Sequence, residues 1–117
     1  RDRKYIDASG KNENQILVKL LLYTDKNFRS RCLLRDAAAS IGYDYAYISK
    51  LFKRKVGISF RQYVNNLRII ESKRLLIDGT KSIEEVAECC GFSSLRTFDR
   101  EFLKQVETTP SNYQKQQ

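Results

Sequence analysis

Residues 34–56 read LRDAAASIGYDYAYISKLFKRKV, and residues 83–106 read IEEVAECCGFSSLRTFDREFLKQV. The two stretches match at a period of 49, which becomes 50 after one inserted residue. In each copy a short helical pattern ends at Gly42 or Gly91, the residue type that favours a left-handed helix C-terminus. A short turn and a longer helical pattern follow. The sequence therefore predicts two helix-turn-helix units.

The second helix of each unit has a clear inner face. Its apolar residues recur every four positions, at Ile48, Phe52 and Val56 in the first unit and at Phe98, Phe102 and Val106 in the second. The outer arcs then hold Ala46, Tyr47, Lys50, Lys53 and Arg54 in the first unit, and Arg96, Thr97, Arg100 and Lys104 in the second. A basic outer face is common on any exposed helix. Two such faces at matched positions of duplicated units favour a nucleic-acid partner.

The rest of the chain also predicts helices. Residues 59–78 form a long amphipathic pattern between the two units, which Asp78-Gly79 ends. At 1.5 Å per residue, roughly 20 residues span ~30 Å, close to the ~34 Å between successive major-groove faces of B-DNA. An apolar stripe over residues 14–23 predicts a first packed helix, and Thr109-Pro110 predicts the start of a short closing helix.

Charge and composition narrow the function classes. The 117 residues carry a net charge of +8, which favours a polyanionic partner, and residues 1–58 hold 13 Lys/Arg against 6 Asp/Glu. There are three Cys and no His, and the Cys spacing fits no metal site, so neither a metal nor another cofactor is predicted. The sequence contains no phosphate-binding glycine loop, no nucleophile-base arrangement and no apolar run that could span a membrane, which disfavours an enzyme and a membrane protein.

These motifs resemble a known family. The stretches AxxxGYDYAYISKLFKRKVGISFRQYVNNLRI (38–69) and SIEEVAECCGFSSLRTFDREFLKQVETTPSNY (82–113) are similar to the C-terminal DNA-binding domain of AraC/XylS-type bacterial transcription regulators. An Ile/Val-Ala pair, a Gly-Phe, a Phe-x-x-x-Phe and a Thr-Pro-x-x-Tyr recur at that family's spacings. The resemblance covers about residues 12–114.

The resemblance implies an all-α fold of about seven helices. It divides the chain into an N-terminal helix-turn-helix subdomain (12–58), a linker helix (59–78) and a C-terminal helix-turn-helix subdomain (79–114), with flexible ends at 1–11 and 115–117. The second helix of each subdomain is expected to enter one of two adjacent major-groove segments of double-stranded DNA.

Site residues follow from the resemblance by position. The expected base-contacting residues are Ala46, Tyr47, Ser49 and Lys50 in the first unit, and Arg96, Thr97, Asp99 and Arg100 in the second. The expected phosphate contacts are Lys53, Arg54, Arg61 and Lys104, because these cations flank the two faces and phosphate contacts set the register without reading the sequence. Alternatives stay open for three of these: simple surface packing for Tyr47, and ion pairs with Asp99 or Glu101 for Arg96 and Arg100. Asp99 either accepts from a cytosine amino group or holds an arginine in place, and Glu101 faces solvent or the rest of the protein.

The expected function is sequence-specific DNA binding by a bacterial transcription regulator, commonly an activator in this family. Expected partners are promoter or operator DNA and RNA polymerase, with a ligand-binding or dimerisation domain upstream, in the cytoplasm at the bacterial nucleoid. The alternative is a helical module that binds RNA or an acidic protein. The sequence departs from the family at Glu107, where a Gly is expected, and at Leu33, where a polar N-cap is expected.

Overall fold

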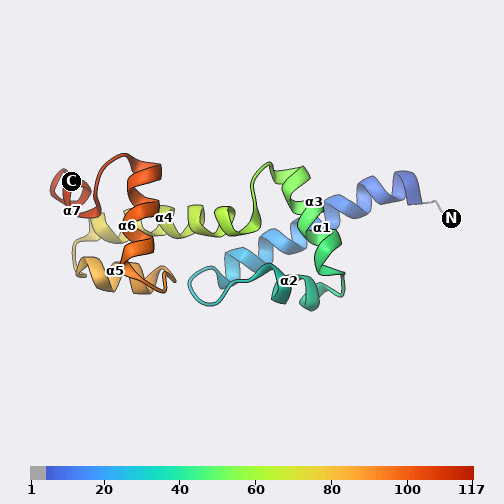
Figure 1. The fold of residues 1–117 in the computed structure, drawn as a ribbon, viewed down its shortest axis with the longest axis horizontal. Helices are drawn as coiled ribbons and strands as arrows, with labels where there is room; N and C mark the ends of the chain where they lie inside the picture. Colours follow the sequence, from blue (N-terminus) through green and yellow to red (C-terminus); the bar gives the residue numbers. More distant parts are fainter. Residues whose placement is uncertain (1–4) are drawn as a thin grey trace. The chain divides into compact units, whose positions relative to one another are not determined.

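The computed structural model describes residues 5–117, with side chains from residue 12 onward. Over these residues the chain forms seven helices and no strand, which confirms the predicted all-α fold (Figure 1). The helices are α1 (Tyr5–Asn27), α2 (Leu34–Ile41), α3 (Tyr45–Val56), α4 (Phe60–Asp78), α5 (Ile83–Cys89), α6 (Leu95–Val106) and α7 (Pro110–Lys115). Of the end expected to be flexible at 1–11, residues 1–4 lie outside the described residues, and the backbone of 5–11 begins α1.

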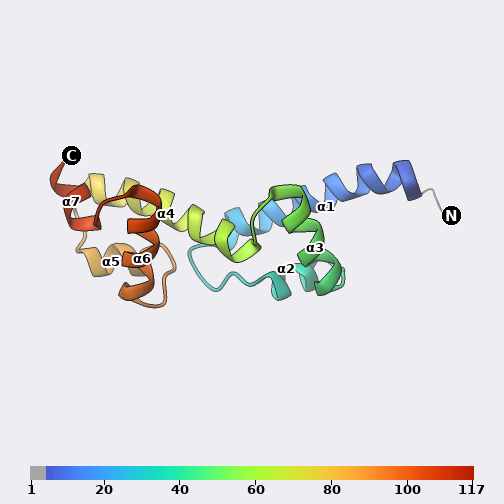
Figure 2. The same cartoon turned by 45° about the horizontal axis from the view of Figure 1, so that its top comes forward.

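The described chain divides into two compact units. Unit 1 combines residues 5–27 with 32–62, and unit 2 combines residues 28–31 with 63–117. In unit 1, α1, α2 and α3 pack against one another, and the two views in Figures 1 and 2 show α2 next to α3. In unit 2, α6 packs against both α5 and α7. Each unit therefore contains one of the predicted helix-turn-helix pairs, α2–α3 or α5–α6.

The core of unit 1 comes from one face of each of its helices. The side chains of Ile16, Leu20, Ala37, Ala38, Ile48, Leu51, Phe52 and Phe60 are buried. The Phe52 and Phe60 rings meet edge to face with their centroids 5.3 Å apart, a favourable aromatic geometry. The predicted inner face of the second helix is thus buried at Ile48 and Phe52.

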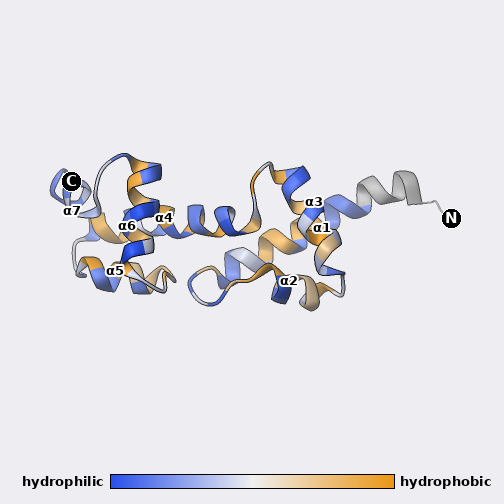
Figure 3. Cartoon of the chain, in the orientation of Figure 1, coloured by the Kyte–Doolittle hydropathy of each residue, from blue (hydrophilic) through white to orange (hydrophobic). Residues whose placement is uncertain are grey.

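The core of unit 2 is a chain of aromatic rings. Phe98 lies 5.2 Å from Phe92 and 5.7 Å from Phe102, and Phe102 lies 5.6 Å from Tyr113 on α7, all between ring centroids. Phe98 and Phe102 are fully buried, so they are core residues as expected. Figure 3 shows hydrophilic and hydrophobic residues alternating along α6, as an amphipathic helix requires.

Polar side chains cap the starts of four helices. Side chains of Asp44, Ser82, Ser94 and Thr109 accept backbone hydrogen bonds at the starts of α3, α5, α6 and α7. The turns of the two units close alike: Tyr43 N–H donates to Ala38 O and Phe92 N–H donates to Ala87 O, both at 3.0 Å. The two turns therefore close with the same backbone hydrogen bonds, although the turn of unit 2 is one residue longer before its N-cap.

Unit 2 also holds a short segment from between α1 and α2. Phe28 is buried, and Arg68 of α4 donates from Nε to Phe28 O at 2.7 Å and from Nη2 to Ser30 O at 2.9 Å. Glu71 on the same helix pairs with Arg29 at 3.5 Å. These contacts join residues about forty positions apart in sequence and fix the segment 28–31 on unit 2.

Candidate nucleic-acid interface

Helix α3 presents one face of unit 1 to solvent. Its start is fixed because the Tyr47 N–H donates to the Asp44 carboxylate at 3.2 Å, and its inner side is fixed by buried Ile48, Leu51 and Phe52. The opposite side carries five of the predicted site residues, all of them exposed: Ala46, Tyr47, Lys50, Lys53 and Arg54. Ser49 is half-buried beside this face. The packing of α3 alone is therefore enough to turn these side chains outward.

Tyr47 is the largest residue on this face. Its side chain is 40% exposed, and its ring centroid lies 6.2 Å from that of Tyr43 in the preceding turn. Partial burial raises the pKa of the Tyr47 hydroxyl above its usual value, and the negative charge of Glu13 adds to this. The hydroxyl therefore stays protonated at neutral pH, and the ring offers an apolar edge held by its neighbour.

Arg54, a predicted phosphate contact, has an internal partner. Its guanidinium donates to both carboxylate oxygens of Glu13 on α1, at 2.9 and 3.4 Å. The next residue, Lys55, lies 3.7 Å from the same carboxylate and donates to the Asn14 side chain at 3.4 Å. The hydrogen bond from Arg54 holds the pKa of the Glu13 carboxyl below its ordinary value. Sequence reasoning missed Glu13 because no local pattern links residues 41 positions apart.

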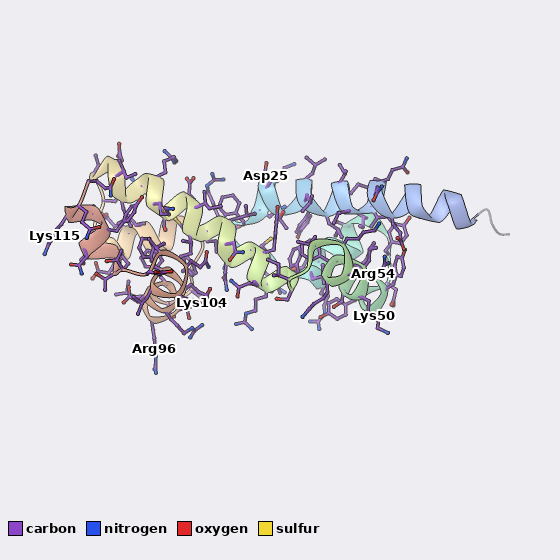
Figure 4. The ribbon with its side chains drawn as sticks, turned by 90° about the horizontal axis from the view of Figure 1, so that it is seen from above. Asp25, Lys50, Arg54, Arg96, Lys104 and Lys115 are labelled. Atoms are coloured by element: carbon purple, nitrogen blue, oxygen red, sulfur yellow. The ribbon has the colours of Figure 1, made fainter. Side chains whose placement is uncertain are left out.

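Helix α6 presents the corresponding face of unit 2. Arg96, Asp99 and Arg100 are exposed, and none of them has an ion pair within 4.0 Å among the residues the structure describes. Figure 4 shows Arg96 extending clear of the helix. Thr97 is half-buried and belongs to the cap, since the Ser94 hydroxyl donates to the Thr97 hydroxyl at 3.0 Å. The alternative of an arginine paired with Asp99 or Glu101 is not found within residues 12–117.

Glu101 lies on the protein side of α6. Its side chain is only 7% exposed; Gln105 donates to the carboxylate at 3.2 Å, and Lys104 lies 4.0 Å away. Of the two expected orientations, solvent or the rest of the protein, the structure has the second. Glu101 follows Phe98 by three residues, a spacing that brings it round to the buried side. Lys104 itself remains exposed, so this predicted phosphate contact reaches solvent beside a partly neutralising carboxylate.

Arg61 and Ser49 line one hollow of unit 1. This hollow has a volume of about 290 Å³, and its wall also includes Arg35, Tyr45 and the buried thiol of Cys32. Arg61 lies in the first turn of α4 and is exposed, whereas Ser49 comes from the side of α3. The structure thus brings together a predicted base contact and a predicted phosphate contact from different helices of unit 1.

Within the described part of the chain, no three His, Cys, Asp or Glu side chains form a group that could hold a metal ion. Cys89 is exposed. Cys90 is buried, and its burial raises the pKa of its thiol to about 12. None of the helices between residues 5 and 117 has the length and apolar character needed to cross a bilayer.

Comparisons with known proteins agree with this geometry. Residues 37–116 match the model of a family described as a helix-turn-helix domain. The regulatory protein PocR of Salmonella typhimurium is 34% identical over 100 residues, which are 86% of this chain and 33% of PocR. The HTH-type transcriptional regulator YtdP of Bacillus subtilis is 30% identical over 110 residues, which are 94% of this chain and 14% of YtdP. The chain thus spans a third or less of the length of these relatives.

Solved structures share the fold. The C-terminal domain of AraT, a response regulator from Geobacillus stearothermophilus, superposes with a TM-score of 0.82 at 25% identity and covers 87% of this chain and 85% of that one. The DNA-binding domain of the global transcriptional factor AdpA, solved with a target DNA, has a TM-score of 0.79 at 22% identity over 86% of this chain and 90% of that one. The chain belongs to the AraC-type helix-turn-helix family of DNA-binding transcription regulators.

Proposed function

We propose that the chain binds double-stranded DNA sequence-specifically, with α3 and α6 each placed in a major-groove segment. One observation supports this proposal above the others. Two helices of equal length, at matched positions of two units, each bury an aromatic inner side and turn exposed cationic side chains outward. The AdpA domain with the same fold was solved with its target DNA. An α-helix fits the major groove, where base edges differ between all four base pairs.

The predicted site residues divide into two roles. We assign base contacts to the N-terminal and central outward residues of the two helices: Ala46, Tyr47, Ser49 and Lys50 on α3, and Arg96, Thr97, Asp99 and Arg100 on α6. We assign phosphate contacts to the flanking cations Lys53, Arg54, Arg61 and Lys104. Phosphate contacts set the position of the protein on the duplex, and base contacts select the sequence. Arg54 contacts a phosphate only when its ion pair with Glu13 opens, or when the guanidinium binds Glu13 and the phosphate together.

The chain would be the DNA-binding part of a longer regulator. The matched segment is only 33% of its relative PocR and 14% of its relative YtdP. We propose that a ligand-binding or dimerisation domain elsewhere in such a protein controls DNA binding in the bacterial cytoplasm. A contact with RNA polymerase, and activation as its result, belong to the same proposal.

Selection of a bound duplex, followed by affinity measurements, tests DNA binding. A random library of duplexes is passed over the immobilised chain to select a bound sequence of about 20 base pairs, and its affinity is compared with that of single-stranded RNA and heparin at about 150 mM salt. We expect the selected duplex to bind on the order of a thousandfold more tightly than a random duplex. Equal binding of all these polyanions would contradict the proposal and favour an RNA- or acidic-partner-binding module.

Two substitutions test the role division. Removal of the Arg100 side chain (Arg100→Ala) should weaken the selected duplex by about 1–3 kcal/mol and relax the preference at one or two positions. Removal of the Lys53 side chain (Lys53→Ala) should weaken all duplexes alike and reduce the slope of log K against log salt by about one. Equal losses on every sequence in both variants would contradict the assignment.

A further inference from the structure

The two outward faces differ in chemistry at matched positions. With the offset of 50 residues, Arg96 corresponds to Ala46 and Arg100 corresponds to Lys50. Helix α6 therefore carries two arginines four residues apart, on adjacent turns of one face. Helix α3 has none in its first two turns. The difference lies in the part of each helix that the proposed function places against base edges.

The arginines of α6 are available to a ligand. Both side chains are exposed, and neither has an ion pair or a hydrogen bond with the side chains and backbone described from residue 12 onward, so their planar groups of N–H donors are not used there. A guanidinium donates two parallel hydrogen bonds, and in the major groove guanine alone offers the matching pair of acceptors, O6 and N7. The geometry of α6 thus favours guanine.

The one arginine of α3 is occupied. Arg54 spends two donors on Glu13, and Lys55 lies against the same carboxylate. The Glu13 side chain is 19% exposed, so its carboxylate is mostly shielded from solvent where the two cations meet it. At the end of α3, one of the three cationic charges is therefore compensated within unit 1 by Glu13, whereas Arg96 and Arg100 of α6 have no ion pair with a described residue.

An apolar surface takes the place of the arginines on α3. Ala46 and Tyr47 lie next to each other on the exposed face, and the Tyr47 ring packs beside that of Tyr43 with the centroids 6.2 Å apart. In the major groove the thymine C5-methyl is the apolar group that such side chains contact. Lys50 beside them supplies a single charge without the fork of an arginine.

We infer that the operator is chemically asymmetric, with guanine in the segment that faces α6 and thymine in the segment that faces α3. This inference rests on the proposed DNA-binding function and adds the bases that each helix selects. It does not require the two units to hold any fixed arrangement, because each preference arises within one unit.

Selection with variants assigns the two segments. A random duplex library is enriched on the wild-type chain, on Arg100→Lys and on Tyr47→Ala, with Tyr47→Phe as the matched control. Arg100→Lys keeps the charge but loses the two parallel donors of the guanidinium. It should therefore reduce the preference for guanine in one segment by roughly 5- to 150-fold and leave the salt slope unchanged. Tyr47→Ala should reduce the preference for thymine in the other segment, and Tyr47→Phe should keep that preference because the ring remains.

Base analogues then test the contacts directly on the selected duplex. Replacing thymine by uracil in the α3 segment removes only the methyl group and should weaken binding by roughly 2- to 5-fold per contacted base. Replacing guanine by 7-deazaguanine in the α6 segment removes the N7 acceptor and should weaken wild type strongly but Arg100→Ala little. The same replacements in the opposite segment should have smaller effects.

Several results would overturn the inference while leaving the proposed function intact. These are guanine in the segment that Tyr47→Ala relaxes, no loss on uracil replacement, or a Tyr47→Phe variant as impaired as Tyr47→Ala, which would assign the contact to the hydroxyl. Failure to enrich any duplex over random sequence is a different result and would contradict DNA binding itself. Thermal melts of each variant, matched to wild type, exclude loss of the fold.

Discussion

The two helix-turn-helix units close their turns with the same backbone hydrogen bonds but differ at their helix ends. In unit 2 the first helix begins with a reciprocal capping box between Ser82 and Glu85, whereas in unit 1 it begins at Leu33 with no side-chain cap. The second helices show the reverse: α3 ends at Gly57, and α6 ends at Glu107 with φ of 65°. Each unit thus has one favourable and one unfavourable helix end. The motif therefore forms in both units although each has one of these ends without its favoured residue.

The interiors differ as well. At matched positions of the second helices, unit 1 buries Leu51 and unit 2 buries Glu101. The carboxylate keeps a hydrogen bond from Gln105 and a lysine nearby, as a buried charge requires. A leucine needs none of this. Two second helices of equal length thus bury very different side chains at matched positions.

The largest expected effect comes from the turn glycines. A Cβ at Gly91 would lie 2.6 Å from Phe28 O and 2.9 Å from the Arg29 carbonyl carbon, both backbone atoms, whereas a Cβ at Gly42 would meet nothing within 4 Å. Both residues have positive φ. We expect Gly91→Ala to lower the free energy of unfolding by about 2–5 kcal/mol and Gly42→Ala by about 1 kcal/mol. Urea unfolding followed by circular dichroism measures both, and equal losses would show that the segment 28–31 moves aside freely.

Next in size are the helix starts. Replacing the cap of α5 (Ser82→Ala) removes the acceptor for the Glu85 N–H and should cost about 1 kcal/mol. Supplying a cap to α2 (Leu33→Ser) should instead raise the free energy of unfolding by about 0.5 kcal/mol. Thermal melts of the two variants check the opposite signs. A loss of stability in Leu33→Ser would mean that the leucine contributes more by packing than a cap can supply.

A smaller effect is expected at the ends of the second helices. Glu107 is the one non-glycine residue with positive φ among the described residues. A glycine there (Glu107→Gly) should stabilise the chain by about 0.5–1 kcal/mol, because it removes the left-handed strain at a modest entropic cost. The matched change Gly57→Ala should destabilise by a similar amount. The pair is compared by chemical denaturation, and two changes of the same sign would contradict the strain argument.

The smallest effect concerns the charges of α3. Replacing the carboxylate that pairs with Arg54 and Lys55 (Glu13→Gln) should free these cations for phosphates, raise DNA affinity roughly 2- to 5-fold and steepen the salt slope by about one. Glu84→Gln on α5 is the matched control, since it removes the same charge from an exposed residue. Fluorescence anisotropy at several salt concentrations gives both quantities. Weaker binding by Glu13→Gln would show that Glu13 instead orients Arg54 toward DNA.

Local patterns in the sequence were enough to predict the helices and the turn glycines. Asp44 and Ser82 act within three residues of themselves, so their roles follow from short-range chemistry. The outward faces followed from the burial of every fourth residue, as at Phe98 and Phe102. The base and phosphate roles assigned to those faces stay predictions.

Contacts between distant residues were not predictable in the same way. The Glu13–Arg54 pair joins residues 41 positions apart and depends on how α1 packs against α3. The burial of Glu101 depends on which side of α6 the core covers, and a helical wheel places a residue near the boundary without deciding it. Both features change the charge that the interface offers, so the structure adds most where electrostatics is concerned.

The hydrogen bonds from Arg68 to the segment 28–31 have a consequence for protein engineering. Unit 2 is not a continuous stretch of chain, since Phe28 reaches it from a point 35 residues ahead of Tyr63 in the sequence. An excised fragment that starts at Tyr63 would lack this buried phenylalanine and leave the Arg68 guanidinium without its two carbonyl acceptors. A transplantable version of unit 2 would need residues 28–31 joined back to it by a linker, so that the excised domain regains its missing piece.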